Sequence, residues 1–179
     1  GLLDSLLAWF RMQGEQGYFH PQPFRLLPVV KDTIKIYKIK ALKNHIRIYN
    51  QVPQELFVVA DQQMVMTILR NLLSNALKHT PSGKKIRIDA RVSEEKIVVS
   101  VNDQGQGIRP EYLDTLFQGG NRITTQGLSG EKGSGMGLVL CKDLIDRHGE
   151  QIWVESQPER GSSFMFSLPA WRKSNTQIS

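Results

Sequence analysis

The stretch "DQQMVMTILRNLLSNALKHT", residues 61–80, decides the fold that the rest of the sequence can adopt. Asp61 is a good N-cap residue, and the apolar side chains after it recur at a helical spacing. They form one continuous face: Val65, Ile68, Leu69, Leu72, Leu73, Ala76 and Leu77. A helix with so wide an apolar face has to bury it, so the stretch predicts a helix packed on a second layer of structure.

Segments with strand patterns lie on both sides of this helix. Before it, "HIRIYNQ" and "LFVVAD" predict strands around residues 46–50 and 57–60. After it, residues 84–103 alternate apolar and polar side chains around a polar turn at 93–95, which is typical of a β-hairpin. Two more strand patterns, "QIWVES" and "SSFMFSLP", lie near the end of the sequence.

Helical patterns fill most of the remaining chain. They cover residues 26–44 and 136–148, with a short helix expected before Phe117, while "GYFHPQPFRL" reads as an extended link. Helix runs and hairpins follow one another without strict alternation. The order therefore predicts an α+β two-layer sandwich, with helices on one face of a mixed, mostly antiparallel sheet.

The pattern divides the chain into three parts. Residues 1–17 contain a helix whose apolar stripe has nothing beside it in sequence to bury it, residues 18–170 form the main domain, and residues 171–179 are a polar tail. Within the domain, residues 118–135 are rich in Gly, Thr, Ser and Gln. So long an irregular connection is usually functional or mobile.

Composition narrows the class of protein. The chain has 179 residues, is 40% hydrophobic and carries a net charge of +6, which makes an anionic partner plausible: a polyphosphate or a nucleic acid. The basic run at residues 35–47 reads as the solvated face of an amphipathic helix and lacks an aromatic or major-groove signature, so no nucleic-acid partner is expected. The single cysteine, Cys141, excludes an internal disulfide framework and any multi-cysteine metal site.

Polar side chains interrupt the helix at 61–80 on one face. Asn71, Asn75 and Lys78 follow one another at spacings of four and three residues, with His79 on the flank. This face is either an ordinary solvated surface or the polar wall of a binding site. The helix alone leaves both interpretations open.

The sequence "NDQGQGI", residues 102–108, follows a predicted strand. Gly105 and Gly107 allow the backbone to turn sharply and approach a ligand, while the Asp103 carboxylate can accept a hydrogen bond from it. A plain turn that begins at Asp103 fits the same residues.

The glycine-rich stretch "GEKGSGMGL", residues 130–138, opens the helix at 136–148. Gly133, Gly135 and Gly137 alternate at a helix N-terminus, where unpaired N–H groups and the helix dipole favour phosphate. The spacing is neither that of the P-loop nor that of the dinucleotide fingerprint. A flexible hinge loop is the alternative.

Five motifs, taken in this order, resemble those of the catalytic ATP-binding domain of sensor histidine kinases. That domain has the Bergerat fold, which is shared with gyrase and the large heat-shock chaperones. The motifs resemble the N box, the first glycine box, the F box, the second glycine box and the closing strand: "NLLSNALKHT", "DQGQGI", "LF" at 116–117, "GEKGSGMGL" and "GSSFMFSLP".

The resemblance implies roles for the helix face in phosphoryl transfer. Asn75 would coordinate Mg²⁺ that bridges the phosphates of ATP, Asn71 would assist from one turn earlier, and Lys78 would neutralise phosphate charge. These three residues are the expected catalytic set. His79 would lie near the phosphates or the ribose.

The resemblance also implies the contacts of the rest of ATP. Asp103 would accept a hydrogen bond from the adenine amino group, with Gly105 and Gly107 letting the ring approach, and residues 118–135 would be a flexible ATP lid. Further ATP contacts are expected at Ile108, Phe117, Arg122, Lys132, Gly133, Ser134, Gly135, Met136, Gly137, Leu138 and Ser162.

The family's partners follow from the same resemblance. Residues 1–17 resemble the end of the second helix of a dimerisation and histidine phosphotransfer domain, with its linker. None of the four histidines fits the acceptor pattern, so the acceptor is expected upstream of residue 1. The fragment is then expected to be monomeric and cytoplasmic. Its parent chain is expected to be a homodimer, either cytoplasmic or an inner-membrane sensor, and its second partner the receiver domain of a response regulator.

Two other functions stay open at this stage. An ATPase of the same superfamily is disfavoured because such members place a glutamate base where this chain has Asn71, and an amide cannot take a proton from water. A nucleotide-sensing pseudokinase is suggested by Met136 and by the "HGE" sequence at 148–150, which depart slightly from the family pattern.

Overall fold

The computed structural model describes residues 19–118 and 136–171. In chain order the elements are β1 (Gln22–Arg25), α2 (Leu26–Lys43), β2 (Arg47–Gln51), β3 (Phe57–Ala60), α3 (Gln62–His79), β4 (Lys85–Ser93), β5 (Lys96–Asp103), α4 (Pro110–Leu113), α5 (Gly137–Arg147), β6 (Ile152–Gln157) and β7 (Gly161–Pro169). The predicted strands, hairpin and helices in these ranges are confirmed, with ends that differ by a few residues at most.

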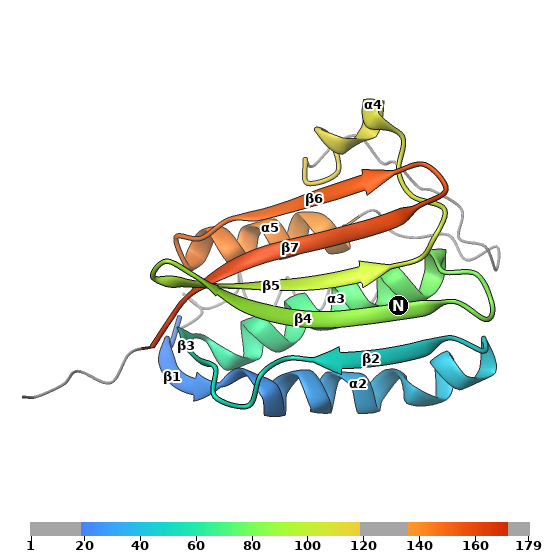
Figure 1. Ribbon diagram of the computed structural model, residues 1–179. Coiled ribbons are helices and arrows are strands. Elements are labelled where there is room, and N and C mark those ends of the chain that lie inside the picture. The colour runs from blue at the N-terminus through green and yellow to red at the C-terminus, as the bar shows by residue number, and fades with distance from the viewer. Residues whose placement is uncertain (1–18, 119–135, 172–179) are drawn as a thin grey trace, which may run out of the picture.

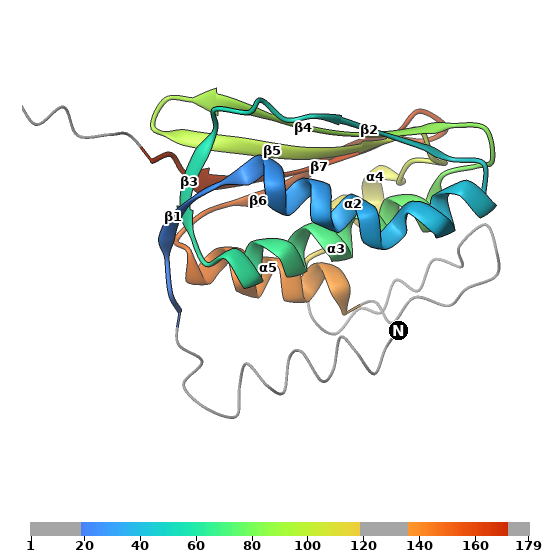
Figure 2. The same ribbon diagram turned by 90° about the horizontal axis from the view of Figure 1, so that it is seen from below.

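The main sheet has five strands in the order β2-β4-β5-β7-β6. β2 runs parallel to β4, and every other pair is antiparallel. Figures 1 and 2 show α2, α3 and α5 side by side on one face of this sheet, while no helix layer formed by the described residues covers the other face. The predicted two-layer α+β sandwich is therefore confirmed.

The core lies between the helix layer and the sheet. All seven apolar residues predicted for the inner face of α3 are buried, and the sheet meets them with Ile88, Val99, Phe164 and Phe166, among others. The Asp61 side chain accepts hydrogen bonds from the N–H groups of Gln63 and Met64 at 3.0 and 3.1 Å, as expected of an N-cap. In the two described parts of the chain, no helix is long and apolar enough to cross a membrane.

One part of the predicted extended link is a strand. β1 pairs with β3 in a separate antiparallel two-stranded sheet, from Gln22 opposite Ala60 to Arg25 opposite Phe57. Proline at 23 lacks an N–H but has an extended backbone, and it is tolerated because β1 needs hydrogen bonds on one side only. The two prolines of this segment therefore masked a strand in the sequence pattern.

A histidine joins the start of α3 to the end of α5. The Asp61 N–H donates to His148 Nε2 at 3.0 Å, and His148 Nδ1 lies 2.7 Å from the Leu144 carbonyl oxygen. Because a carbonyl only accepts, Nδ1 carries the proton and Nε2 is the acceptor. The segment that leads into β1 reaches the same point: the His20 N–H donates to Asp61 Oδ2 at 3.1 Å, and the Phe19 ring meets the His148 ring edge-on.

The turn between β6 and β7 packs directly on the backbone that follows β5. Gly107 has φ of +68°, and a Cβ placed on it would lie 1.9 Å from the Gln157 carbonyl oxygen. Gly161 has φ of +90°, and its Cβ would lie 2.0 Å from the Asp103 carbonyl oxygen. No side chain fits at either position, so both glycines are required by close approach as well as by conformation.

A matched pair of substitutions separates these two requirements. Gly149 also has φ of +68°, but a Cβ there would meet no atom within 4 Å. Gly149→Ala is expected to lower the free energy of unfolding by about 1–2 kcal/mol, the ordinary cost of the left-handed conformation. Gly107→Ala should lose at least about 2 kcal/mol more, since the backbone has to move apart, in urea unfolding of the two variants. Equal losses would mean that Gly107 is not held against Gln157.

Candidate functional site

The polar face of α3 lies beside the start of α5. The Asn71 Nδ2 group donates to the Thr67 carbonyl oxygen at 2.9 Å, which fixes the orientation of its amide. A Cβ on Gly137, the first residue of α5, would lie 2.9 Å from Asn71 Oδ1. The helix N-terminus expected to face phosphate is therefore next to the predicted polar face.

The Asn75 side-chain amide on this face is available to bind a ligand. Asn75 is half-buried, and its side chain has no hydrogen-bond partner among residues 19–118 and 136–171. Lys78 is also half-buried on the next turn of α3. The face therefore carries amide oxygens and, at Lys78, a positive charge, and these groups suit phosphate and a hard metal ion.

The carboxylate predicted at the end of β5 is buried. Asp103 is 8% exposed, and its Oδ1 atom accepts hydrogen bonds from the N–H groups of Gly105 at 2.8 Å and Ser162 at 3.3 Å. Burial raises the pKa of Asp103 to about 6, against the opposing effect of these two N–H groups. The group is therefore mostly ionised at neutral pH, and neither of these two bonds uses Oδ2.

His79 ends α3 beside this carboxylate. A Cβ on Gly105 would lie 2.5 Å from the His79 carbonyl oxygen, so the end of α3 and the stretch after β5 touch. Burial first, and the charge of Lys78 second, lower the pKa of His79 to about 4, so its ring is neutral at pH 7. His79 Nδ1 is buried and has no partner in the described part of the chain.

Ser156, on β6, belongs to the site although the sequence did not reveal it. Its Oγ accepts from the Ile108 N–H and donates to the Gly161 carbonyl oxygen, both at 2.9 Å. The hydroxyl of Ser162, 2.9 Å away, must then be the donor in their contact. These bonds hold the glycine stretch against β6 and β7. A serine in a strand pattern carries no signal that would have marked this role.

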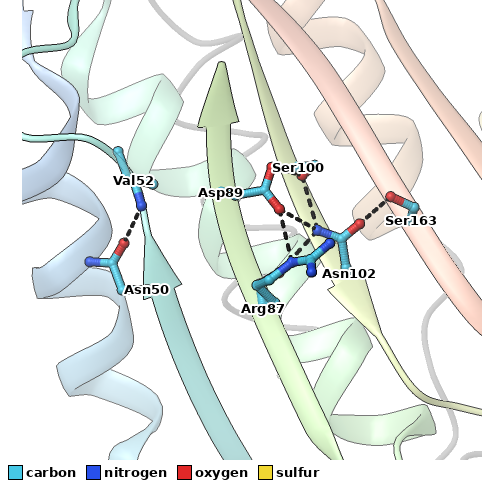
Figure 3. Close-up of polar contacts among 7 residues, drawn as sticks. All are labelled: Asn50, Val52, Arg87, Asp89, Ser100, Asn102 and Ser163. Carbon is cyan, nitrogen blue, oxygen red and sulfur yellow. Dashed lines mark hydrogen bonds and ion pairs between the residues drawn. The ribbon is translucent and has the colours of Figure 1, made fainter.

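A polar network on the opposite face of the sheet supports the end of β5. The side chain of Asn102 points away from the helix layer and donates to Asp89 Oδ2 and Ser100 Oγ, both at 3.0 Å, while Ser163 donates to Asn102 Oδ1 (Figure 3). β4, β5 and β7 are thus tied together one residue before Asp103. The network fixes where the buried carboxylate lies.

The other predicted site residues divide into two groups. Ile108, Phe117 and Leu138 pack partly buried against the core, and Met136 is the N-cap residue of α5. Of the predicted lid, residues 119–135 lie outside the described residues, and with them the predicted contacts Arg122, Lys132, Gly133, Ser134 and Gly135. The predicted helix in residues 1–17 and the tail from residue 172 also lie outside them.

A cluster of acidic or sulfur ligands is absent from the described part of the site. Among the residues that the structure describes, no three His, Cys, Asp or Glu side chains are placed to hold a metal ion. A metal at this site would need the Asn75 amide oxygen together with ligand oxygens and water. Mg²⁺ is commonly bound in that way, so the residues fit the ion that the resemblance implies.

The raised pKa of Asp103 makes stability depend on pH. The carboxyl takes up a proton near pH 6 in the folded chain but near pH 3.8 in the unfolded chain. Protonation of Asp103 therefore favours the folded state, and this stabilisation is complete below about pH 4 and is lost as the pH rises through about 6. An asparagine side chain would keep the acceptor oxygen without the charge. When the pH is raised from about 4.5 to 7.5, the free energy of unfolding of Asp103→Asn should therefore increase relative to that of wild type by on the order of 2 kcal/mol. Urea unfolding at both pH values tests this. A difference that does not change with pH would contradict it.

Known proteins resemble this chain in sequence. Residues 60–172 match the family described as histidine kinase-, DNA gyrase B-, and HSP90-like ATPase. The adaptive-response sensory kinase SasA of Synechocystis sp. is 34% identical over 173 residues, which cover 96% of this chain and 45% of that protein. SasA of Rippkaea orientalis is 35% identical, with coverage of 96% and 44%. The chain therefore spans a little under half the length of these curated relatives.

Solved structures agree with the sequence relatives. The catalytic domain of the histidine kinase ThkA superposes with a TM-score of 0.72 at 29% identity, covering 83% of this chain and 97% of that chain. ThkA in complex with the response regulator protein TrrA has a TM-score of 0.75 at 24% identity, which shows the fold alone. Since the family match includes all of α3, β5 and α5, the chain belongs to the histidine kinase-, DNA gyrase B- and HSP90-like ATPases, as a catalytic domain of the histidine kinase type.

Proposed function

We propose that this chain is the ATP-binding catalytic domain of a two-component sensor histidine kinase. It would transfer the γ-phosphate of ATP to a histidine on a dimerisation and phosphotransfer domain upstream of the fragment. The observation that carries the proposal is Asp103: a buried carboxylate, ionised at neutral pH, which two backbone N–H groups hold through one oxygen. Such a group suits a ligand that donates a hydrogen bond, as the adenine amino group does.

The base of ATP would bind at the end of β5. Asp103 Oδ2 would accept from the adenine amino group, while the small residues Gly105 and Gly107 leave the ring access to the backbone. The ring of His79 is neutral and contributes an uncharged polar atom, Nδ1. The base would therefore be selected by one acceptor of fixed position.

The phosphates would bind between α3 and α5. The N–H groups at the start of α5 and the Lys78 ammonium group favour negative charge, and Asn71 and Asn75 line the same side of α3. Mg²⁺, held by Asn75, would supply charge neutralisation at the phosphate oxygens when bound. Phosphoryl transfer depends mainly on positioning and charge neutralisation, and these side chains suit both.

The other superfamily activities are less well supported. The Asn71 amide already donates to Thr67 and cannot act as a base toward water, which disfavours a dedicated ATPase. A histidine acceptor needs no such base, because neutral imidazole is itself a nucleophile. Neither Met136 nor the departure at 148–150 removes a metal or phosphate ligand of the proposed site, so nothing favours a pseudokinase.

The similarity to proteins named as sensory kinases also supports inferences about the parent chain and its partners. We infer a homodimeric parent chain with this domain on the cytoplasmic side, a receiver domain of a response regulator as second partner, and a fragment that is monomeric by itself. ThkA, whose complex with a response regulator protein is known, supports the second partner.

Removal of the metal-binding amide tests the nucleotide site. Asn75→Ala should weaken binding of a non-hydrolysable ATP analogue by at least about tenfold in the presence of Mg²⁺, and much less with EDTA, because only the metal-bridged contact is lost. Gln62→Ala, an exposed change at the far end of α3, is the matched control and should bind as wild type does. Calorimetric titration measures both. If Asn75→Ala keeps the wild-type affinity for Mg·ATP, the metal assignment fails.

Phosphotransfer tests the reaction itself. The isolated chain should gain no acid-labile phosphate from labelled ATP, because none of its four histidines is a suitable acceptor. Addition of the parent's separate phosphotransfer domain should give phosphohistidine on that domain, and Asn75→Ala should abolish it. Nucleotide binding without any transfer would instead favour a pseudokinase.

A further inference from the structure

α2 carries much of the positive charge of the chain and an exposed apolar surface. It contains five lysines and one aspartate. In its second half Ile36, Ile39 and Leu42 are 53%, 69% and 63% exposed. The basic run was expected to be a plain solvated face, and every lysine of α2 except Lys40 is indeed exposed, but three large aliphatic side chains lie among them. Gathered apolar side chains on a surface mark interaction sites more often than single ones do.

These side chains form one stripe along the helix. Pro28, Asp32, Lys35, Ile39 and Leu42 follow one another at spacings of four, three, four and three residues, which places them in line on one side of α2. Figures 1 and 2 show α2 at the edge of the helix layer, with α3 on its inner side. The stripe with its neighbours Lys31, Ile36, Lys38 and Lys43 is called the α2 surface below.

The first half of the α2 surface is hollowed. A shallow cavity of about 350 Å³ is lined by Arg25, Leu27, Pro28, Lys31, Asp32, Lys35 and Gln54. The carboxylate of Asp32 is 2.8 Å from Lys35 Nζ, so the acidic lining residue already has a partner. The cavity therefore presents positive charge at one end of the stripe, and the apolar side chains lie at the other.

We propose that the α2 surface docks an amphipathic helix of a partner protein, one whose apolar residues are flanked by Asp and Glu. From Pro28 to Leu42 the stripe is about 21 Å long at 1.5 Å per residue, which suits a straight partner helix with apolar residues at the same spacing. Charge complementarity selects the acidic partner. A second copy of α2 would instead bring ten lysines together against two aspartates.

The proposal goes beyond nucleotide binding. No residue of the candidate nucleotide site lies on α2, so a partner there would be recognised separately from ATP. Variants of the α2 surface should bind Mg·ATP as wild type does. Failure of one proposal is therefore distinguishable from failure of the other.

A synthetic peptide tests the docking surface. The probe is a fluorescein-labelled 18-residue peptide (about five helical turns) with Leu at heptad spacing and Glu elsewhere, and the control peptide has the same composition with the spacing scrambled. In anisotropy titrations the chain should bind the first peptide at least about tenfold more tightly than the second, and more weakly as salt rises.

Variants show whether the named side chains carry the binding. The double variant Ile39→Ser with Leu42→Ser, and the variant Lys31→Glu with Lys38→Glu, should each lose at least about tenfold in affinity. Val92→Ser is the matched control: Val92 is an exposed aliphatic residue, 58% exposed, on β4. It should leave the affinity unchanged.

Five outcomes would overturn the proposal. Equal binding of the scrambled peptide would mean that the peptide is held by non-specific charge attraction alone. So would unchanged binding by the variant with the Ile39 and Leu42 changes. A dimer that is lost in the same double variant, by sedimentation, would make a second copy the occupant. Tighter binding to phosphatidylserine vesicles than to the peptide, through these residues, would make it a membrane. Much tighter peptide binding by a chain that begins at Phe19 would make residues 1–18 the occupant.

Discussion

Direct contact of backbone with backbone at the end of β5 is the constraint on which the candidate site depends. Gly107 lies against the Gln157 carbonyl oxygen and Gly161 against that of Asp103, at separations that exclude any side chain. These contacts bring the turn between β6 and β7, the stretch after β5 and the carboxylate of Asp103 into one rigid unit. The ligand-facing acceptor is therefore positioned by the chain path itself, and the hydrogen bonds of Ser156 hold that path in place.

Burial shifts the pKa values of Asp103 and His79 in opposite directions. Burial disfavours the charged form of each, so the pKa of Asp103 rises and that of His79 falls. The result at neutral pH is a negative acceptor at Asp103 and a neutral ring at His79, with Lys78 as the neighbouring cation on α3. In the proposed site, this distribution separates the end that would accept a hydrogen bond from the base and the end that would bind the phosphates.

The sequence predicted most of the fold because the fold depends on local patterns, and the structure brings predicted site residues together, with Gly137 next to Asn71 and Gly105 next to Asp103. The apolar face of α3, the hairpin of β4 and β5, and the Asp61 cap each follow from spacing within one segment. β1 was missed because prolines hide a strand whose partner, β3, lies more than thirty residues away. Ser156 was missed for a similar reason: its role comes from the turn that packs on it, and a serine in a strand looks the same with or without such a neighbour.

The point where the chain enters the domain lies at the opposite end of α3 from the site. Phe19 contacts His148, and His20 bonds to Asp61 at the first turn of the helix, whereas Asn75 lies about 21 Å farther along it at 1.5 Å per residue. One continuous helix, α3, therefore connects the two places. A tilt of α3 by about 10° about its first turn would displace Asn75 by roughly 3–4 Å, about the length of one hydrogen bond.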